Sequence, residues 1–115
     1  MDDTVAWDRD DNPTIQDIAL ARTETDDGVL LCVAGELDLV TADQFRDRLI
    51  SEISRTESRV ILDLSGVTFM STAGLNALLR AGELAGPRLQ VRAMSQAVRR
   101  VLELTSLVDR FPIVT

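Results

Sequence analysis

Two adjacent hydroxyl side chains, Ser71 and Thr72, are the residues whose types and spacing best allow chemistry in this sequence. They lie in the stretch FMSTAGL, residues 69–75, between an apolar segment and the predicted first turn of a helix. A hydroxyl in such a position can cap the helix, attack a substrate as a nucleophile, or accept a phosphoryl group from a kinase. The three roles belong to different classes of protein, so choosing among them narrows the function.

The composition argues against a nucleophile. A Ser or Thr hydroxyl needs a neighbouring base before it attacks a substrate, and this 115-residue chain contains no His, no Lys and no Tyr. The stretch also departs from the G-x-S-x-G turn of α/β-hydrolases. We therefore predict that the protein is not an enzyme and has no catalytic residue.

Metal and cofactor sites lack their usual residues. With no His and a single Cys, only carboxylates could bind a metal, and the Asp-rich N-terminus lacks the glycine spacing of a calcium loop. The segment LSGVTFMSTAG has no Lys and matches neither the P-loop nor the dinucleotide-binding pattern. Cys32 lies in the apolar run VLLCVA, which favours a small buried strand residue over a reactive thiol. We predict no metal and no cofactor.

The charge and hydropathy of the chain limit the kinds of partner that it can bind. The formal charge of −7 disfavours nucleic acid and anionic membrane surfaces, because binding either needs a basic face on the protein. No apolar run approaches the roughly 20 residues that span a bilayer, and the N-terminus lacks the basic and apolar regions of a signal peptide. These features predict a cytoplasmic protein that binds neither nucleic acid nor membrane.

Helix-capping rules assign different roles to the two hydroxyls. With Ser71 as the N-cap, Met70 and Leu75 take the two positions of a hydrophobic staple. With Thr72 as the N-cap, the same positions fall on Ser71 and Asn76, and Asn76 is not apolar. We therefore predict that Ser71 caps the helix and that Thr72 lies one residue inside it with a free hydroxyl.

A free hydroxyl in the first helical turn is suited to carry phosphate. The helix N-terminus presents unpaired N–H groups and about half a positive charge, whereas a phosphate adds roughly −1.5 to −2 charges. The helix itself would tolerate the group, with about 0.3–1 kcal/mol of favourable dipole interaction. A partner docked over the helix end would instead meet new charge and bulk, which is the logic of a binding switch.

The surrounding pattern predicts an α/β domain that would hold this helix start. Short apolar or alternating runs predict strands at 18–23, 29–34, 59–64 and 88–93. Amphipathic spacing predicts helices over about 42–55, over 72–85 and after Ser95. The order β-β-α-β-α-β-α indicates a mixed, largely parallel sheet of four to five strands with packed helices.

The sequence supports more detailed predictions for two of these elements, the strand at 29–34 and the first helix. The run 29–34 is apolar throughout and predicts a central strand buried on both faces. Thr41 is predicted to cap the first helix, with Gln44 three residues later completing a capping box. Val40 and Phe45 take the positions of a hydrophobic staple at the same helix start.

The two ends of the chain differ in composition from the middle. Residues 1–14 are rich in Asp and are expected to form a mobile acidic tail, which leaves 15–115 as the domain. Trp7 either docks on the domain or a partner, or has no role. The C-terminal FPIV, residues 111–114, is expected to add a short edge segment to the sheet.

Three motifs in order resemble a known family. RVILDLSGVTFMSTAGLNALL resembles the core motif of STAS-domain anti-sigma factor antagonists, in which a strand ending in Asp-Leu-Ser leads through an apolar loop to Asp-Ser-Ser-Gly-Leu and a helix. GELDLVTA at 35–42 and AVRRVLELTSLVDRFPI near the end are similar to two further segments of that family. The resemblance covers about residues 15–115 and implies a single STAS-like domain.

The resemblance also implies a function. Antagonists of this family are cytoplasmic bacterial regulators, for example of stress responses. The unphosphorylated form binds an anti-sigma factor, often a GHKL-type serine/threonine kinase, and so frees a sigma factor for transcription. The kinase phosphorylates the antagonist, which dissociates, and a phosphatase restores it. We expect a monomer or weak dimer. The alternatives are a STAS module of a stressosome scaffold or lipid-transport complex, and a small-molecule or nucleotide-binding domain.

The resemblance places the functional residues as well. The family's phospho-acceptor falls on Thr72, with Ser71 as second choice, and the family's preceding Asp falls on Ser71. Asp and Ser are near-equal N-caps, so this replacement removes a charge that the kinase could recognise but spares the fold. The expected partner-binding residues are Gly35, Glu36, Asp38, Val67, Phe69, Met70, Ser71, Thr72, Gly74, Leu75 and Asn76. The alternative for Phe69 and Met70 is burial beneath the helix, and for Glu36 and Asp38 a solvated turn.

Overall fold

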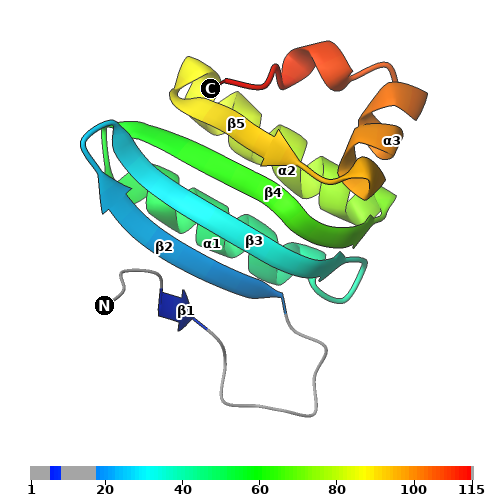
Figure 1. Cartoon of the computed structure of the whole chain (residues 1–115), viewed down its shortest axis with the longest axis horizontal. Helices are drawn as coiled ribbons and strands as arrows, with labels where there is room; N and C mark the ends of the chain where they lie inside the picture. The colour runs from blue at the N-terminus through cyan, green and yellow to red at the C-terminus, as the bar shows by residue number, and fades with distance from the viewer. Residues whose placement is uncertain (1–5, 9–17, 115) are drawn as a thin grey trace.

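The computed structural model describes residues 6–8 and 18–114, which form a five-stranded sheet with helices packed against it (Figure 1). The strands are β1 (Ala6–Asp8), β2 (Ala19–Thr25), β3 (Gly28–Leu37), β4 (Arg59–Met70) and β5 (Leu89–Met94). The helices are α1 (Ala42–Arg55), α2 (Thr72–Ala85) and α3 (Gln96–Leu104), with 3₁₀ turns η1 (Gly86–Arg88) and η2 (Val108–Arg110). From β2 onward the order is the predicted β-β-α-β-α-β-α, so the predicted α/β class is confirmed.

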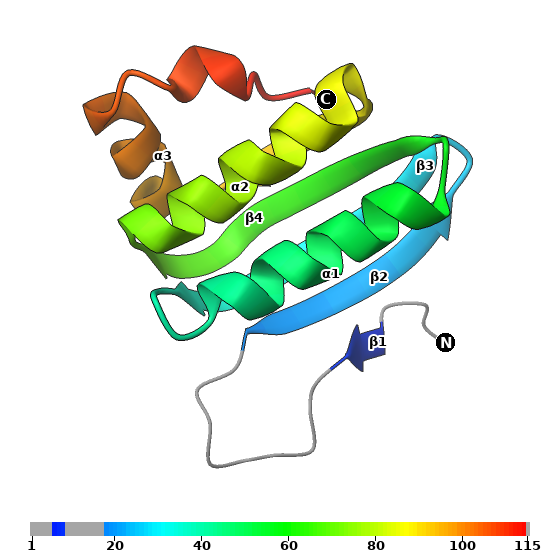
Figure 2. The ribbon, with the colours of Figure 1, turned by 180° about the vertical axis from the view of Figure 1, so that it is seen from behind.

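The sheet has the strand order β1-β2-β3-β4-β5, with antiparallel pairing from β1 to β3 and parallel pairing from β3 to β5. Each parallel step needs a crossover, which α1 and α2 supply. Crossovers share one hand, and both step in the same direction, so α1 and α2 lie side by side on one face (Figure 2). The ends of β3 and β4, the loop before α1 and the start of α2 therefore meet at one end of the molecule.

The hydrophobic core lies between this sheet face and the two helices. On α1, Phe45, Leu49 and Ile53 recur every four residues and are at most 2% exposed, so they form one buried face. On α2, Leu78 is fully buried, whereas Leu79 is only partly buried. The core is thus mainly aliphatic, and Phe45 and Phe111 add aromatic rings to it.

Strand β3 is buried on one face only, which corrects the expectation for residues 29–34. Val29, Leu31 and Val33 point to the helices and are at most 4% exposed. Leu30 and Cys32 point the other way and are only partly buried. The reason is the shared hand of the crossovers, since α1 and α2 occupy the same face and leave the opposite one uncovered by either.

Strand β4 continues to Met70, so residues 65–70, expected as an apolar loop, belong to the strand. A Cβ added at Gly66 would lie 2.9 Å from the Cβ of Ala34, and the lack of a side chain there lets β3 and β4 approach. The register shifts near this contact, between Cys32 and Ala34 and between Gly35 and Glu36, where β4 has the extra residue each time, and the pairing ends with Leu37 opposite Met70. The two strand ends are thereby level, which sets where α2 begins.

The structure near the two ends of the chain bears on the expected N-terminal tail and the expected C-terminal edge segment. Strand β1 lies within the segment expected to be a tail and pairs antiparallel with β2, which the sequence did not predict. The remainder of residues 1–14 and the side chain of Trp7 lie outside the described residues. At the other end, Ile113 forms an isolated bridge with Val91 of β5, so the predicted edge segment is confirmed.

Candidate functional site

The start of α2 has the predicted cap. Ser71 has extended backbone (φ −92°, ψ 177°), and its hydroxyl accepts a hydrogen bond from the Gly74 N–H at 3.4 Å. The Ser71 carbonyl accepts from the Leu75 N–H at 2.9 Å, which is the first bond of the helix. The prediction that Ser71 is the N-cap is therefore confirmed, and its hydroxyl is engaged by its own helix.

Thr72 is the first residue of α2, and its side chain is exposed. Within residues 6–8 and 18–114, no group donates to or accepts from its hydroxyl. The unpaired N–H groups and partial positive charge of a helix N-terminus lie directly beneath it. The structure thus gives Thr72 no bonding role in the fold and leaves its oxygen accessible to another protein.

The first turn of α2 is seated on the end of β3. The Ser71 N–H donates to the Leu37 carbonyl at 2.8 Å. A Cβ added at Gly74 would lie 2.8 Å from the Leu37 carbonyl oxygen and 2.9 Å from its Cβ, closer than real side chains pack. Glycine is thus required for this close approach, which fixes Thr72 relative to the residues that follow Leu37.

Those residues form the loop between β3 and α1, which Asp38 organises. One carboxylate oxygen, Oδ1, accepts from the backbone N–H groups of Val40 at 2.9 Å and Thr41 at 3.0 Å. The Thr41 hydroxyl donates to the Glu36 carbonyl at 2.6 Å and accepts from the Asp38 N–H at 3.0 Å. Thr41 is the N-cap residue of α1, as predicted, but the predicted side-chain cap is absent. This buried hydroxyl points back into the loop and makes no cap bond to α1.

These hydrogen bonds lower the pKa of the Asp38 carboxyl, the backbone N–H of Thr41 contributing most. Donors aimed at a carboxylate stabilise its charged form, so the group stays ionised to lower pH than a free Asp. Asp38 thus has a structural role in the loop while its side chain stays partly exposed.

Two apolar side chains project from this loop. Leu39 is 80% exposed and Val40 is 68% exposed, while Phe69 at the end of β4, paired with Glu36, is 48% exposed. The predicted staple between Val40 and Phe45 is wrong, since the turn held by Asp38 directs Val40 outward. Neither loop residue was among the predicted partner-binding residues, although two adjacent aliphatic residues in a short loop are a visible signal in the sequence.

The structure divides the predicted partner-binding residues into two groups. Those at the surface, exposed or partly so, are Gly35, Glu36, Asp38, Phe69, Ser71, Thr72 and Asn76. Those in the core, at most 5% exposed or classed as buried, are Val67, Met70, Gly74 and Leu75. The core residues offer a partner little surface in this conformation, and their part in binding stays a prediction. The alternative of burial beneath the helix holds for Met70 and not for Phe69.

A groove of about 530 Å³ runs between α1 and α2 and opens onto the same end of the molecule. Its lining includes Leu39 from the loop together with Ala73 and Asn76 from the first turns of α2. Its charged rim consists of Asp43, Arg46, Arg80 and Glu83. The shared lining shows that the loop tip and the start of α2 form one continuous surface.

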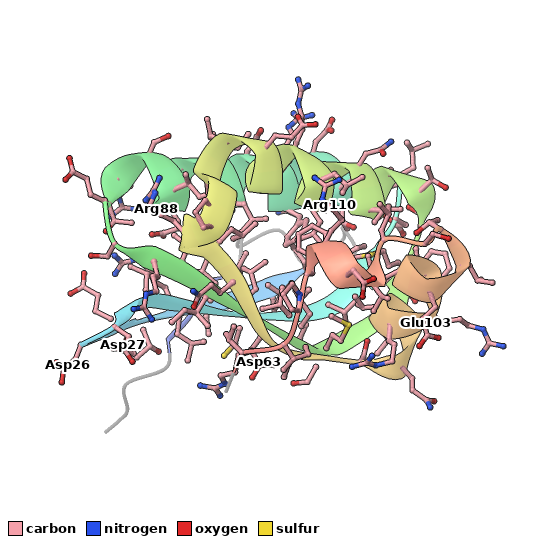
Figure 3. The ribbon with its side chains drawn as sticks, turned by 90° about the horizontal axis from the view of Figure 1, so that it is seen from above. Asp26, Asp27, Asp63, Arg88, Glu103 and Arg110 are labelled. Carbon is pink, nitrogen blue, oxygen red and sulfur yellow. The ribbon has the colours of Figure 1, made fainter. Side chains whose placement is uncertain are left out.

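Two ionisable side chains elsewhere in the fold, Asp63 and Cys32, have shifted pKa values. Asp63 lies on the sheet side of the molecule (Figure 3), and there burial acts to raise its pKa. Bonds from the Ser65 hydroxyl and N–H and the charge of Arg92 outweigh this effect and leave the pKa lowered. Burial and the nearby Asp63 raise the pKa of Cys32, which disfavours a thiolate. No three potential metal ligands come together within the described residues.

The burial of one carboxylate on α1, that of Glu52, was not predicted from the sequence. Glu52 is 1% exposed and pairs with Arg22 of β2 at 2.9 Å and with Arg55 at 3.5 Å. The signal was its position, since Glu52 falls seven residues after Phe45 on the same apolar face. This ion pair ties α1 to β2.

Comparison with known proteins decides the family. A model of the STAS domain matches residues 19–115. The chain belongs to the STAS domain family. This confirms the resemblance seen in the three sequence motifs. Among the described residues of this STAS protein, no helix combines the length and apolar character needed to cross a membrane.

Two curated proteins are similar to this STAS chain. The protein named "Putative anti-sigma factor antagonist BtrV", from Bordetella bronchiseptica, is 32% identical over 91 residues, which are 76% of this chain and 78% of that protein. The anti-sigma-F factor antagonist RsfB from Mycobacterium tuberculosis is 29% identical over 84 residues, 71% of this chain and 69% of that protein. Both alignments thus extend over most of the STAS domain.

Solved structures agree with the fold. The crystal structure of an anti-sigma factor antagonist from Mycobacterium paratuberculosis superposes with a TM-score of 0.74 at 29% identity, covering 84% of each chain. The structure of the anti-sigma factor antagonist SpoIIAA in its unphosphorylated form gives a TM-score of 0.64 at 24% identity, covering 85% of this chain and 88% of that one. At that identity the second likeness shows the fold alone.

Proposed function

We propose that this STAS protein is a bacterial, cytoplasmic anti-sigma factor antagonist, which binds an anti-sigma factor and so frees a sigma factor for transcription. The observation that carries the proposal is Thr72, an exposed and unbonded hydroxyl at a capped helix start, on a surface that also presents apolar loop residues. The names of BtrV and RsfB support the same function. The protein acts by binding and not by catalysis, as a monomer or weak dimer through residues 15–115.

Phosphorylation of Thr72 is proposed to control the binding. The partner, a GHKL-type serine/threonine kinase, would transfer the terminal phosphoryl group of ATP to the Thr72 oxygen. The bond between the γ-phosphorus and its bridging oxygen would break, ADP would leave, and the kinase would take up the hydroxyl proton. Ser71 is the poorer acceptor because its oxygen already serves the helix cap. The added roughly −1.5 to −2 charges suit the helix N-terminus but oppose a partner docked over it. A phosphatase would hydrolyse the phosphothreonine with water, which restores the Thr72 hydroxyl and releases inorganic phosphate.

The test uses purified anti-sigma kinases encoded in the same genome. Each is incubated with the protein and ATP, the modified residue is mapped by mass spectrometry, and the affinities of both forms are measured by calorimetry. We expect phosphate on Thr72 and an affinity at least about tenfold weaker after modification, equal to about 1.4 kcal/mol. Thr72→Ala should bind without being modified, and Ser71→Ala should still be modified at Thr72.

The outcomes separate the parts of the proposal. Phosphate solely on Ser71 overturns the assignment of the two hydroxyls. Binding without any modification would rule out control by phosphorylation but would leave the proposed antagonist function standing. Absence of binding to every anti-sigma factor removes the antagonist function, and micromolar binding of a free nucleotide in the same calorimeter would favour a nucleotide-binding domain instead.

A further inference from the structure

We propose that Leu39 and Val40 form an apolar knob that inserts into an apolar cleft of the anti-sigma factor, and that basic side chains line the rim of that cleft. This inference rests on the proposed function and names the partner surface that the function requires. It assigns most of the affinity to the β3–α1 loop and leaves the control of binding to Thr72.

The first argument is the exposure of the knob. Leu39 is 80% exposed and Val40 is 68% exposed, at adjacent positions on a loop tip. Single exposed aliphatic residues are common on proteins, but neighbouring ones on a projecting loop mark an interaction surface.

The second argument is the rigidity of the loop. The knob is held by the Asp38 carboxylate, which accepts the N–H groups of Val40 and Thr41, and by the Thr41 hydroxyl, which bonds the Glu36 carbonyl. Backbone bonds continue the restraint, since the Ala42 N–H donates to the Asp38 carbonyl at 2.9 Å. A loop already fixed in one shape loses little conformational entropy on binding, which favours affinity.

The third argument is continuity with the phosphorylation site. Leu39 lines the same groove as Ala73, the residue after Thr72. The close contact of Gly74 with Leu37 keeps the knob and the helix start in a fixed relation. A partner that buries the knob therefore lies against Thr72, where a phosphate would oppose it.

The fourth argument is charge, which decides the chemistry of the occupant. Glu36, Asp38 and Asp43 surround the knob in the sequence, and the formal charge of the chain is −7. Asp43 is partly balanced by Arg46 at 3.2 Å, whereas the exposed Glu36 forms no ion pair with a described residue. This acidic setting fits a basic rim on a protein cleft and disfavours an anionic lipid surface.

The experiment replaces the knob residues singly and together, with Leu39→Ser, Val40→Ser and the double variant. Leu104→Ser is the matched control, since Leu104 is 78% exposed on α3, and Leu84→Ser, 55% exposed on α2, is a second. Affinity for the anti-sigma factor that binds the unmodified protein is measured by calorimetry, and melting is followed by circular dichroism. We expect losses of about tenfold for each single variant and roughly a hundredfold for the double variant. Both controls should stay within about twofold of wild type, with melting unchanged throughout.

Three results would overturn the inference. The first is wild-type affinity in the double variant, provided that the wild type binds the factor. The second is binding of the wild type, but not of the double variant, to vesicles of phosphatidylglycerol and phosphatidylethanolamine, which would make the loop a membrane anchor. The third is a wild-type dimer in sedimentation that is absent in the double variant. In that case the loop would bind a second copy of this chain instead of the anti-sigma factor. If the wild type binds no anti-sigma factor at all, the proposed function fails, and the inference fails with it.

Discussion

Gly74 of α2 lies directly against the backbone of Leu37 at the end of β3, with no room for a side chain between them. This contact joins the helix that carries Thr72 to the strand that leads into the Leu39–Val40 loop. The geometry of the whole candidate surface therefore depends on the absence of a side chain at Gly74.

Gly74→Ala should destabilise the protein even though alanine favours helices. The new Cβ would meet the Leu37 carbonyl oxygen at 2.8 Å, and relieving such a contact costs about 1–3 kcal/mol. Gly82→Ala on the same helix is the control, because its Cβ would lie 3.6 Å from the Phe111 ring, an ordinary contact. The second variant should be neutral or stabilised by up to about 1 kcal/mol. Urea unfolding measures both, and equal effects would argue against the close approach.

Replacing the cap residue separates its two properties, the hydrogen bond and the neutral charge. Ser71→Ala removes the acceptor for the Gly74 N–H and should lower the free energy of unfolding by about 1 kcal/mol. Ser71→Asp restores an acceptor and adds a charge that the helix dipole favours, so its stability should equal or exceed that of wild type. Thermal unfolding of the three proteins tests the order. A Ser71→Ala variant as stable as wild type would contradict the capping role.

The loop should respond to acid through Asp38. Its pKa is lowered in the fold, chiefly by the Thr41 N–H, so the ionised carboxylate adds stability above the ordinary Asp pKa of about 3.9. That contribution is lost as the pH falls through the lowered folded-state value. Asp38→Asn keeps an oxygen acceptor but cannot titrate. The stability difference between wild type and variant should therefore be largest near neutral pH and shrink towards low pH. Chemical denaturation along a pH series measures the difference, which should not be independent of pH.

Arg22→Ala should be much more damaging than loss of an exposed arginine. It leaves the Glu52 carboxylate, 2% exposed, with Arg55 as its remaining ion-pair partner among the described residues, and we expect a loss of about 2–4 kcal/mol. The control is Arg46→Ala, whose partners Asp43 and Asp47 are 78% and 71% exposed, with an expected loss below about 1 kcal/mol. Urea unfolding compares the two variants. Similar small losses would contradict a stabilising role for the Arg22–Glu52 pair.

The sequence predicted the elements well because their signals are local. The recurrence of Phe45, Leu49 and Ile53 marks a helix face regardless of the sheet behind it, and the Ser71 cap follows from its immediate neighbours. What failed depended on contacts across the sheet. The extension of β4 to Met70 requires pairing with β3, and the single buried face of β3 follows from the hand of the crossovers.

The candidate surface was predicted only in part, for a similar reason. Thr41 satisfies the rules for a cap, but its hydroxyl is used by Glu36 and Asp38, which come close only when the loop turns back. The same turn exposes Val40, which spacing alone assigns to a staple with Phe45. Spacing describes neighbours along a helix and carries no information about a loop folded on itself.

The contacts that hold the first turn of α2 on β3 are made by main-chain atoms and by a glycine, and the Thr72 side chain takes part in none of them. A phosphate on that side chain would therefore leave the backbone of this protein where it is. The phosphorylated and unphosphorylated proteins would share one backbone conformation and differ only in the charge and shape of the surface at Thr72. The partner would therefore have to distinguish them by direct contact with that surface.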